Sequence, residues 1–112
     1  MKWSEQQALF KAMVKEESDL LNNKGREYAS DNDALDNFKS QAKEMGVDPL
    51  VVLSIFMNKH YRSIQSYIRN GRKTKSNESI EGRIADLRNY AFLAACLIKD
   101  TPSEEVKKDS VE

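Results

Sequence analysis

The residues best suited to chemistry gather between Pro49 and Asn77, a stretch that contains no Asp or Glu. Its cations are Lys59, Arg62, Arg69, Arg72, Lys73 and Lys75. Lys59 and Arg62 are three residues apart and Arg69 follows seven residues later, so these side chains follow one side of a helix. Phosphate needs convergent donors of this kind, and a guanidinium can give it two parallel hydrogen bonds. The stretch therefore predicts an anion-binding arm; the alternative is a solvated helix face that pairs with acidic flanks.

His60 is the sole histidine and falls on the apolar face of the same predicted helix. A core histidine that is hydrogen-bonded to a neighbour is one interpretation, and ligand contact or general acid–base work is the other. Cys96 is the only other soft ligand, so a zinc site is excluded. Cys96 itself lies in an apolar run, where it is expected to be a small buried hydrophobe.

Carboxylates form two clusters. Glu78 and Glu81 are three residues apart and are predicted to converge on Mg²⁺, which prefers carboxylate oxygens. Asp86 joins them imperfectly, because at ~100° per residue it points about 140° away from Glu81. The second cluster is Glu27, Asp31, Asp33 and Asp36. For both clusters the alternative is helix-start acids and loop polarity. Three tyrosines near the cations are candidates to stack a base or to join the core: Tyr28, Tyr61 and Tyr67.

The length, the net charge and the cysteine content of the chain limit the classes of function that it can have. The 112 residues suit one domain, and 18 cations against 18 anions give no global attraction to nucleic acid or to a membrane. One cysteine fits a reducing compartment, and there is no secretory signal pattern and no apolar run of the ~20 residues that span a bilayer. We therefore expect a cytoplasmic protein. No glycine-rich phosphate loop and no nucleophile elbow is present.

Helical periodicity and end signals predict an all-α fold, a small bundle of three long helices and one short helix. The first helix is expected over 5–23, with Ser4 as its cap and Gly25 as its end. A short helix is expected over 34–45 with Asp33 as its cap, and a third over 49–69 after Asp48-Pro49. The last is expected to start from a cap at Ser76 or Asn77, with Glu78 and Glu81 in its first turn, and to end at Asp100. Residues 1–100 then form one domain, and 101–112 a disordered, charged tail.

Two apolar faces are expected on the helix over 49–69. One carries Leu53, Phe56, Met57, His60, Ile64, Tyr67 and Ile68. The other starts with Val51 and Ile55, so the start of this helix is expected to be buried on two sides. Its second contact is either another helix of the chain or a second subunit, and the second alternative would make the protein a homo-oligomer. The core stripe of the last helix is expected at Ile80, Ile84, Leu87, Ala91, Ala94 and Ile98, broadened by Leu93 and Leu97.

Several segments together resemble small phage and prophage proteins of the nucleotide-modification-associated type, and distantly the all-α NTP pyrophosphatases of the MazG and phage dUTPase class. They are Lys24 to Tyr28, Asn37-Phe38, Met57 to His60 with Ile64, and Glu78 to Asp86 followed by Asn89-Tyr90-Ala91. The resemblance implies an all-α fold, oligomerisation and a role in phage nucleotide metabolism in the bacterial cytosol. It also implies Mg²⁺ held by Glu78, Glu81 and Asp86. The usual Glu-x-x-Glu and Glu-x-x-Asp pattern is incomplete, and Asn58 stands at a frequently acidic position.

Three functions follow as hypotheses. The first is a nucleotide-binding protein of phage type, with or without Mg²⁺-dependent NTP pyrophosphohydrolase activity, whose phosphate-binding residues are Lys59, His60, Arg62, Arg69, Arg72 and Lys73. The second is an anti-defence protein that sequesters a nucleotide without consuming it. The third is an interaction module that acts on a host protein or on nucleic acid; the neutral net charge disfavours nucleic acid. The sequence leaves open whether the protein is an enzyme.

Overall fold

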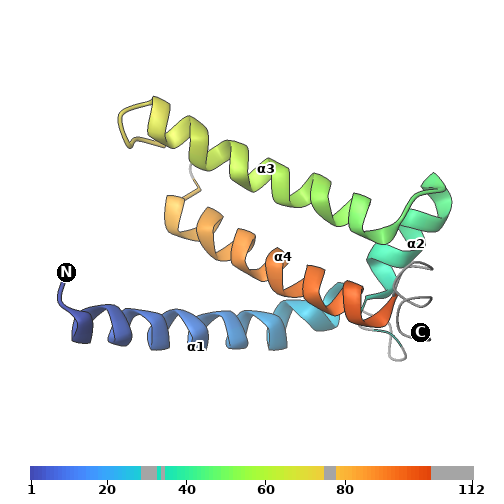
Figure 1. The fold of residues 1–112 in the computed structure, drawn as a ribbon, viewed down its shortest axis with the longest axis horizontal. Helices are drawn as coiled ribbons and strands as arrows, with labels where there is room; N and C mark the ends of the chain where they lie inside the picture. The colour runs from blue at the N-terminus through green and yellow to red at the C-terminus, as the bar shows by residue number, and fades with distance from the viewer. Residues whose placement is uncertain (29–32, 34, 75–77, 102–112) are drawn as a thin grey trace, which may run out of the picture. The chain divides into compact units, whose positions relative to one another are not determined.

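The computed structural model describes residues 1–28, 33, 35–74 and 78–101. Within these ranges the chain is all-α and contains no strand (Figure 1). The helices are α1 (Trp3–Tyr28), α2 (Asp36–Met45), α3 (Pro49–Arg69) and α4 (Ile80–Asp100). Three are long and one is short, which confirms the predicted fold class. The predicted tail lies outside the described residues except for Thr101.

The chain divides into two compact units, Met1–Asn37 and Phe38–Glu112, and each is described by itself. The first consists mainly of α1, and the second contains most of α2 together with α3 and α4. No helix in the described ranges is long and apolar enough to cross a membrane.

Helix α1 extends beyond both predicted ends. It begins at Trp3 because Lys2 caps it: the Lys2 N–H donates to the Glu5 carboxylate (3.3 Å), and the Lys2 carbonyl accepts from the Gln6 N–H (3.0 Å). This is the backward half of a capping box, so the prediction of Ser4 as the cap was wrong. The helix also continues through Gly25 to Tyr28. A glycine inside a helix costs only about 1 kcal/mol relative to alanine, and the residues around it are good helix formers.

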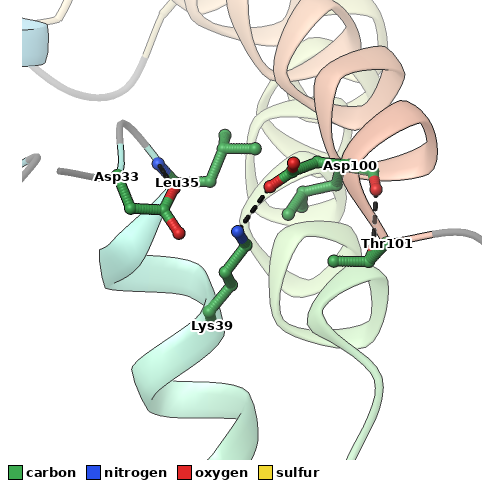
Figure 2. A network of polar contacts seen from close by, with 6 residues as sticks. Asp33, Leu35, Lys39, Asp100 and Thr101 are labelled. Carbon is green, nitrogen blue, oxygen red and sulfur yellow. Dashed lines mark hydrogen bonds and ion pairs between the residues drawn. The ribbon is translucent and has the colours of Figure 1, made fainter.

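Helix α2 starts after the predicted cap. The Asp33 carboxylate accepts from the Leu35 N–H (2.9 Å), and its carbonyl accepts from the Asp36 N–H (3.3 Å) (Figure 2). The helix therefore begins at Asp36; the predicted start, Ala34, lies outside the described residues. Gly46, at φ 70°, ends it as expected, and the Val47 N–H donates to the Ala42 carbonyl (3.0 Å).

Helix α3 has the predicted ends. The Asp48 carboxylate accepts from the Leu50 N–H (2.8 Å), and Pro49 is the first helical residue. Asn70 caps the other end, and Gly71 follows at φ 67°. Arg72 is also left-handed, at φ 64°, and its N–H donates to the Tyr67 carbonyl (2.8 Å). An arginine in this conformation is strained, because its Cβ crowds the backbone.

Helix α4 is capped by Ser79, whose hydroxyl oxygen accepts from the Gly82 N–H (3.0 Å). The predicted caps, Ser76 and Asn77, lie outside the described residues, and the expectation that Glu78 falls in the first turn was wrong. Glu78 precedes the helix, and Glu81 alone of the two is in its first turn. At the other end the N–H and hydroxyl of Thr101 both donate to the Leu97 carbonyl (2.8 and 2.6 Å). The helix thus ends at Asp100, as expected.

The core of the second unit lies where α3 and α4 run side by side (Figure 1). Its most deeply buried side chains are Val52 and Leu53 of α3 and Leu97 of α4, and Phe38 and Ala42 of α2 are buried as well. A column of rings continues this core. Phe38 meets Phe56 edge-on (centroids 6.2 Å apart), and Phe56 stacks on Tyr90 (5.8 Å). At the same end, the Lys39 ammonium pairs with the Asp100 carboxylate, which ties α2 to the last turn of α4 (Figure 2).

Several predicted core positions are not buried. Val51 is 42% exposed and Ile55 is 55% exposed, so within the described chain the start of α3 is not covered on two sides. None of the predicted α4 stripe residues from Ile80 to Ile98 is buried either, whereas Leu97, expected only at its edge, is fully buried. Helical periodicity identifies the positions that share a face, but not the face that a neighbouring helix covers.

Candidate functional site

A pocket of about 210 Å³ lies where the last turns of α3, the turn that follows and the start of α4 come together in the second unit. We call it the α3–α4 pocket. Its lining residues are Ser63, Ser66, Tyr67, Lys73, Thr74, Glu78, Ile80 and Arg83. Most of these carry a side-chain hydrogen-bond donor, and the apolar wall is supplied by Ile80 and the Tyr67 ring. The pocket is therefore a small site whose lining combines hydrogen-bond donors with a comparable amount of apolar surface.

Helix α3 places Ser63, Ser66 and Tyr67 on one side, because residues three and four apart are neighbours on a helix surface. The Ser63 hydroxyl donates to the Lys59 carbonyl (3.1 Å), which fixes its orientation. Tyr67 is held in place from its backbone as well, since its carbonyl accepts the hydrogen bond from the Arg72 N–H.

Lys73 reaches the pocket through the turn that ends α3. The Asn70 side-chain amide donates to the Lys73 carbonyl (3.1 Å), so the turn is tied back on itself. The left-handed Gly71 and Arg72 reverse the chain just before Lys73. Strain at a non-glycine residue of this kind is found mostly where the surrounding structure holds a site in place.

Arg83 and Glu78 form an ion pair at the pocket, with 2.5 Å between the guanidinium and a carboxylate oxygen. The two partners differ in exposure: the Arg83 side chain is 15% exposed and that of Glu78 is 64% exposed. The guanidinium is thus fixed against the protein, while the carboxylate lies largely in water.

His60 lies one turn before Ser63 on α3 but does not line the pocket. It is buried, its ring stacks on Tyr90 (centroids 5.4 Å apart), and its Nδ1 lies 3.8 Å from a carboxylate oxygen of Asp86. That distance is too long for a hydrogen bond, and Nδ1 has no other hydrogen-bond partner among the described residues. His60 therefore sits at the end of the aromatic column.

Burial lowers the pKa of His60 below its usual value, because desolvation disfavours the imidazolium. The nearby Asp86 carboxylate opposes this shift, while the Arg83 and Lys59 cations add to it and Glu78 weakly opposes it. The imidazole is thus neutral at pH 7. Its position fits the interpretation of a core histidine, although the expected hydrogen bond to a neighbour is not formed.

The structure brings few of the predicted phosphate-binding residues together. Lys73 alone of that set lines the pocket. The other cations of the set are exposed and do not line it: Lys59, Arg62, Arg69 and Arg72. Lys75 lies outside the described residues. Of the tyrosines, Tyr67 lines the pocket, Tyr61 is 52% exposed, and the side chain of Tyr28 is outside the described set.

The three predicted metal ligands have separate surroundings. Glu78 is paired with Arg83, Glu81 is exposed in the first turn of α4, and Asp86 faces His60. Within the described ranges, no group of three or more His, Cys, Asp or Glu side chains could hold a metal ion. Magnesium binding by these carboxylates stays a prediction.

The pocket-lining residues that the sequence analysis missed are Ser63, Ser66, Thr74 and Arg83. Ser63, Ser66 and Tyr67 carry a recognisable signal, because their spacing puts three hydroxyls on one side of a helix. Arg83 carries none, since its role depends on how the start of α4 approaches the turn after α3.

Comparison of the chain with family models, with curated proteins and with solved structures found no match. The resemblance to phage nucleotide proteins therefore stays a prediction from the residues quoted for it.

Proposed function

We propose that the protein binds a phosphate-bearing small molecule, a nucleotide, in the α3–α4 pocket. The observation that carries this proposal is the pairing of two cations with hydroxyl donors around one small space. Arg83 and Lys73 supply the positive charge, and Ser66, Thr74 and Tyr67 supply neutral donors. Phosphate oxygens are acceptors only, so a donor-rich lining is what a phosphate group requires.

The Arg83–Glu78 pair is weak enough to be exchanged. A partly exposed ion pair contributes about 0–1 kcal/mol, whereas a hydrogen bond to a charged group contributes about 1.5–3 kcal/mol. A phosphate that takes two hydrogen bonds from Arg83 and one from Lys73 offsets the loss of the Glu78 contact. Glu78, being 64% exposed in its side chain, can then turn into solvent.

The size and the apolar wall indicate which part of a nucleotide the pocket holds. Ligand pockets that enclose a drug-sized molecule measure about 300–1,000 Å³, and this pocket measures about 210 Å³. It therefore suits a phosphate with its attached sugar better than a whole dinucleotide. Tyr67 offers an aromatic face beside Ile80, against which a base or sugar can pack.

Calorimetry with AMP, ATP and inorganic phosphate tests the proposal. We expect binding of at least one nucleotide by the unmodified chain, and a loss of about tenfold or more in affinity for Arg83→Gln and for Lys73→Gln. Arg62→Gln is the matched control, because it removes an exposed α3 cation that does not line the pocket. Equal losses in Arg83→Gln and Arg62→Gln would place the anion on the general positive field of α3 and overturn the proposal.

We propose binding without hydrolysis as the first version. This version is supported by the contacts of two predicted metal ligands: Glu78 pairs with Arg83, and Asp86 lies beside His60. Among the described residues, these carboxylates do not form a group of three that could hold a metal ion. The resemblance favours a Mg²⁺-dependent pyrophosphohydrolase instead. Pyrophosphate release from a panel of NTPs and dNTPs with Mg²⁺ separates the two versions. Turnover that Glu81→Gln abolishes would support the hydrolase, and binding without turnover supports sequestration.

A further inference from the structure

Helix α4 carries an apolar seam that the described chain does not bury. Its positions follow one another at alternating spacings of four and three residues: Ile80, Ile84, Leu87, Ala91, Ala94 and Ile98. This is the repeat with which one helix packs along another over several turns. Ala91 is exposed and Ile98 is 59% exposed, whereas the other four are half-buried.

The same helix already uses a different face inside the chain. Leu97, which lies off the seam, is its one buried residue among those described and is completely buried. Asp86 and Tyr90, also off the seam, meet His60 of α3. Since α3 occupies this other face, the seam is only partly covered within the second unit, where Ile80 also lines the α3–α4 pocket. A long helix whose apolar seam is partly open to solvent can accept a further helix there.

We propose that a second copy of this chain covers the seam, with the two α4 helices antiparallel and a twofold axis passing between Leu87 and Ala91. In this register Leu87 faces Ala91 of the second copy, Ile84 faces Ala94, and Ile80 faces Ile98. Two of these three contacts set a large side chain against a small one, the arrangement by which facing layers interdigitate. The seam is complementary to itself in this direction.

The charges near the two ends of the seam agree with the same register. Glu81 and Lys99 are both exposed and lie on one flank of α4, because their separation of eighteen positions amounts to about five full turns. They stand at opposite ends of the helix, so the twofold axis sets Glu81 of each copy against Lys99 of the other. A parallel arrangement would instead set Glu81 against Glu81.

Phe92 lies on this flank as well and is 53% exposed in the single chain. In the antiparallel register it faces Arg88 of the second copy, and a guanidinium packs favourably on an aromatic face. The covered surface thus includes an aromatic side chain, the residue type most enriched at stable interfaces. This proposal does not require phosphate binding in the α3–α4 pocket, and Ile80 is the seam residue that also lines that pocket.

Sedimentation velocity of the full chain from micromolar to submillimolar concentration tests the dimer. We expect a reversible monomer–dimer equilibrium, and a dissociation constant raised by about tenfold or more in Ala91→Glu, which places a charge in the seam. Ala12→Glu is the matched control, since it makes the same change at an exposed position of α1. Circular dichroism of each variant verifies that the helices are retained. A monomer at every concentration, or a dimer that Ala91→Glu leaves intact, would overturn the proposal.

A charge exchange tests the register. Glu81→Lys and Lys99→Glu should each weaken the dimer, because each turns two attractive contacts into repulsive ones. The double variant Glu81→Lys/Lys99→Glu should return the dissociation constant close to that of the unmodified chain. If the double variant is as weak as the singles, the antiparallel register is wrong. Nucleotide affinity, measured in parallel on Ala91→Glu, tells a failed dimer apart from a failed pocket.

Discussion

The two ends of the α3–α4 pair differ in the chemistry of their side chains. At the α2 end, Leu53 and Leu97 are almost fully buried, and rings and aliphatic side chains fill the space. At the opposite end the helices enclose a polar pocket lined by Arg83, Lys73 and several hydroxyls. His60 lies between these two environments. We therefore expect mutations at the α2 end to change mainly the stability of the fold, and mutations at the pocket end to change mainly the proposed ligand affinity.

The largest effect is expected from a cavity at the apolar end. Leu97→Ala should lower the free energy of unfolding by about 3 kcal/mol, because a leucine at 0% exposure loses its contacts and leaves a void. Urea denaturation measures this change. Ile68→Ala is the control, since a residue that is 65% exposed on α3 should change stability by less than about 1 kcal/mol. Equal losses would mean that the buried end does not dominate stability.

The opposite end should respond in ligand affinity with little change in stability. Glu78→Gln removes the carboxylate that competes for Arg83, so nucleotide affinity should rise by up to about fivefold, which corresponds to about 1 kcal/mol. Calorimetry at low salt measures the change. The metal-dependent alternative predicts the reverse sign, because there Glu78 is a ligand of Mg²⁺. A weaker nucleotide complex in Glu78→Gln would therefore favour the hydrolase.

His60, between the two ends, should make stability depend on pH. Its pKa in the folded chain is lowered, so the unfolded chain binds more protons once the pH falls below the unfolded value of about 6.5. Stability should be constant above that pH and should decrease as the pH falls through it toward the lowered folded pKa. The groups that face the imidazole are Asp86, Glu78 and Arg83 of the α4 side and Lys59 of its own helix.

Urea midpoints between about pH 7.5 and pH 5.5 measure this dependence, in a range where histidine is the side chain that titrates at its ordinary pKa. His60→Gln should flatten the profile, because the chain contains one histidine. A profile for His60→Gln that falls as steeply as that of the unmodified chain would show that another group carries the effect.

The smallest effect is expected in the turn that positions Lys73. Arg72 is left-handed at φ 64°, and glycine adopts this conformation without strain. Arg72→Gly should therefore raise stability slightly, by less than about 1 kcal/mol, because relief of strain is partly offset by the entropy of the unfolded glycine. Thermal unfolding measures it. Arg69→Gly is the control. Because Arg69 is helical, the same substitution there should lower the stability of the fold.

The parts of the fold that were predicted from sequence depend on local chemistry. Asp48-Pro49 and Asn70-Gly71 set both ends of α3, because capping and left-handed turns involve only neighbouring residues. The start of α1 also depends on neighbouring residues, but the prediction chose the wrong cap. The Lys2 N–H donates to the Glu5 carboxylate, so the helix begins before Ser4. Gly25 was misread as an end, since a glycine stops a helix only where the chain needs a left-handed residue.

The site was less accessible to sequence reasoning. The positive stretch includes Lys73, which lines the pocket, but charge along a helix does not show which cations converge. Arg62 and Arg69 have the right chemistry and lie away from the pocket lining, whereas Arg83 comes from an acid-rich segment and is brought in by tertiary packing. The α4 seam likewise was predicted as core, and in the described chain it is half-exposed surface.

A titration of the ¹⁵N-labelled chain with AMP, followed by amide chemical shifts, tests the separation of the two ends most directly. The largest shifts should occur at Ser63, Ser66, Tyr67, Lys73, Thr74 and Arg83, with Leu53 and Leu97 nearly unchanged and with the response lost in Arg83→Gln. Shifts centred on Lys59, Arg62 and Arg69, or the absence of any shift up to millimolar AMP, would contradict the account.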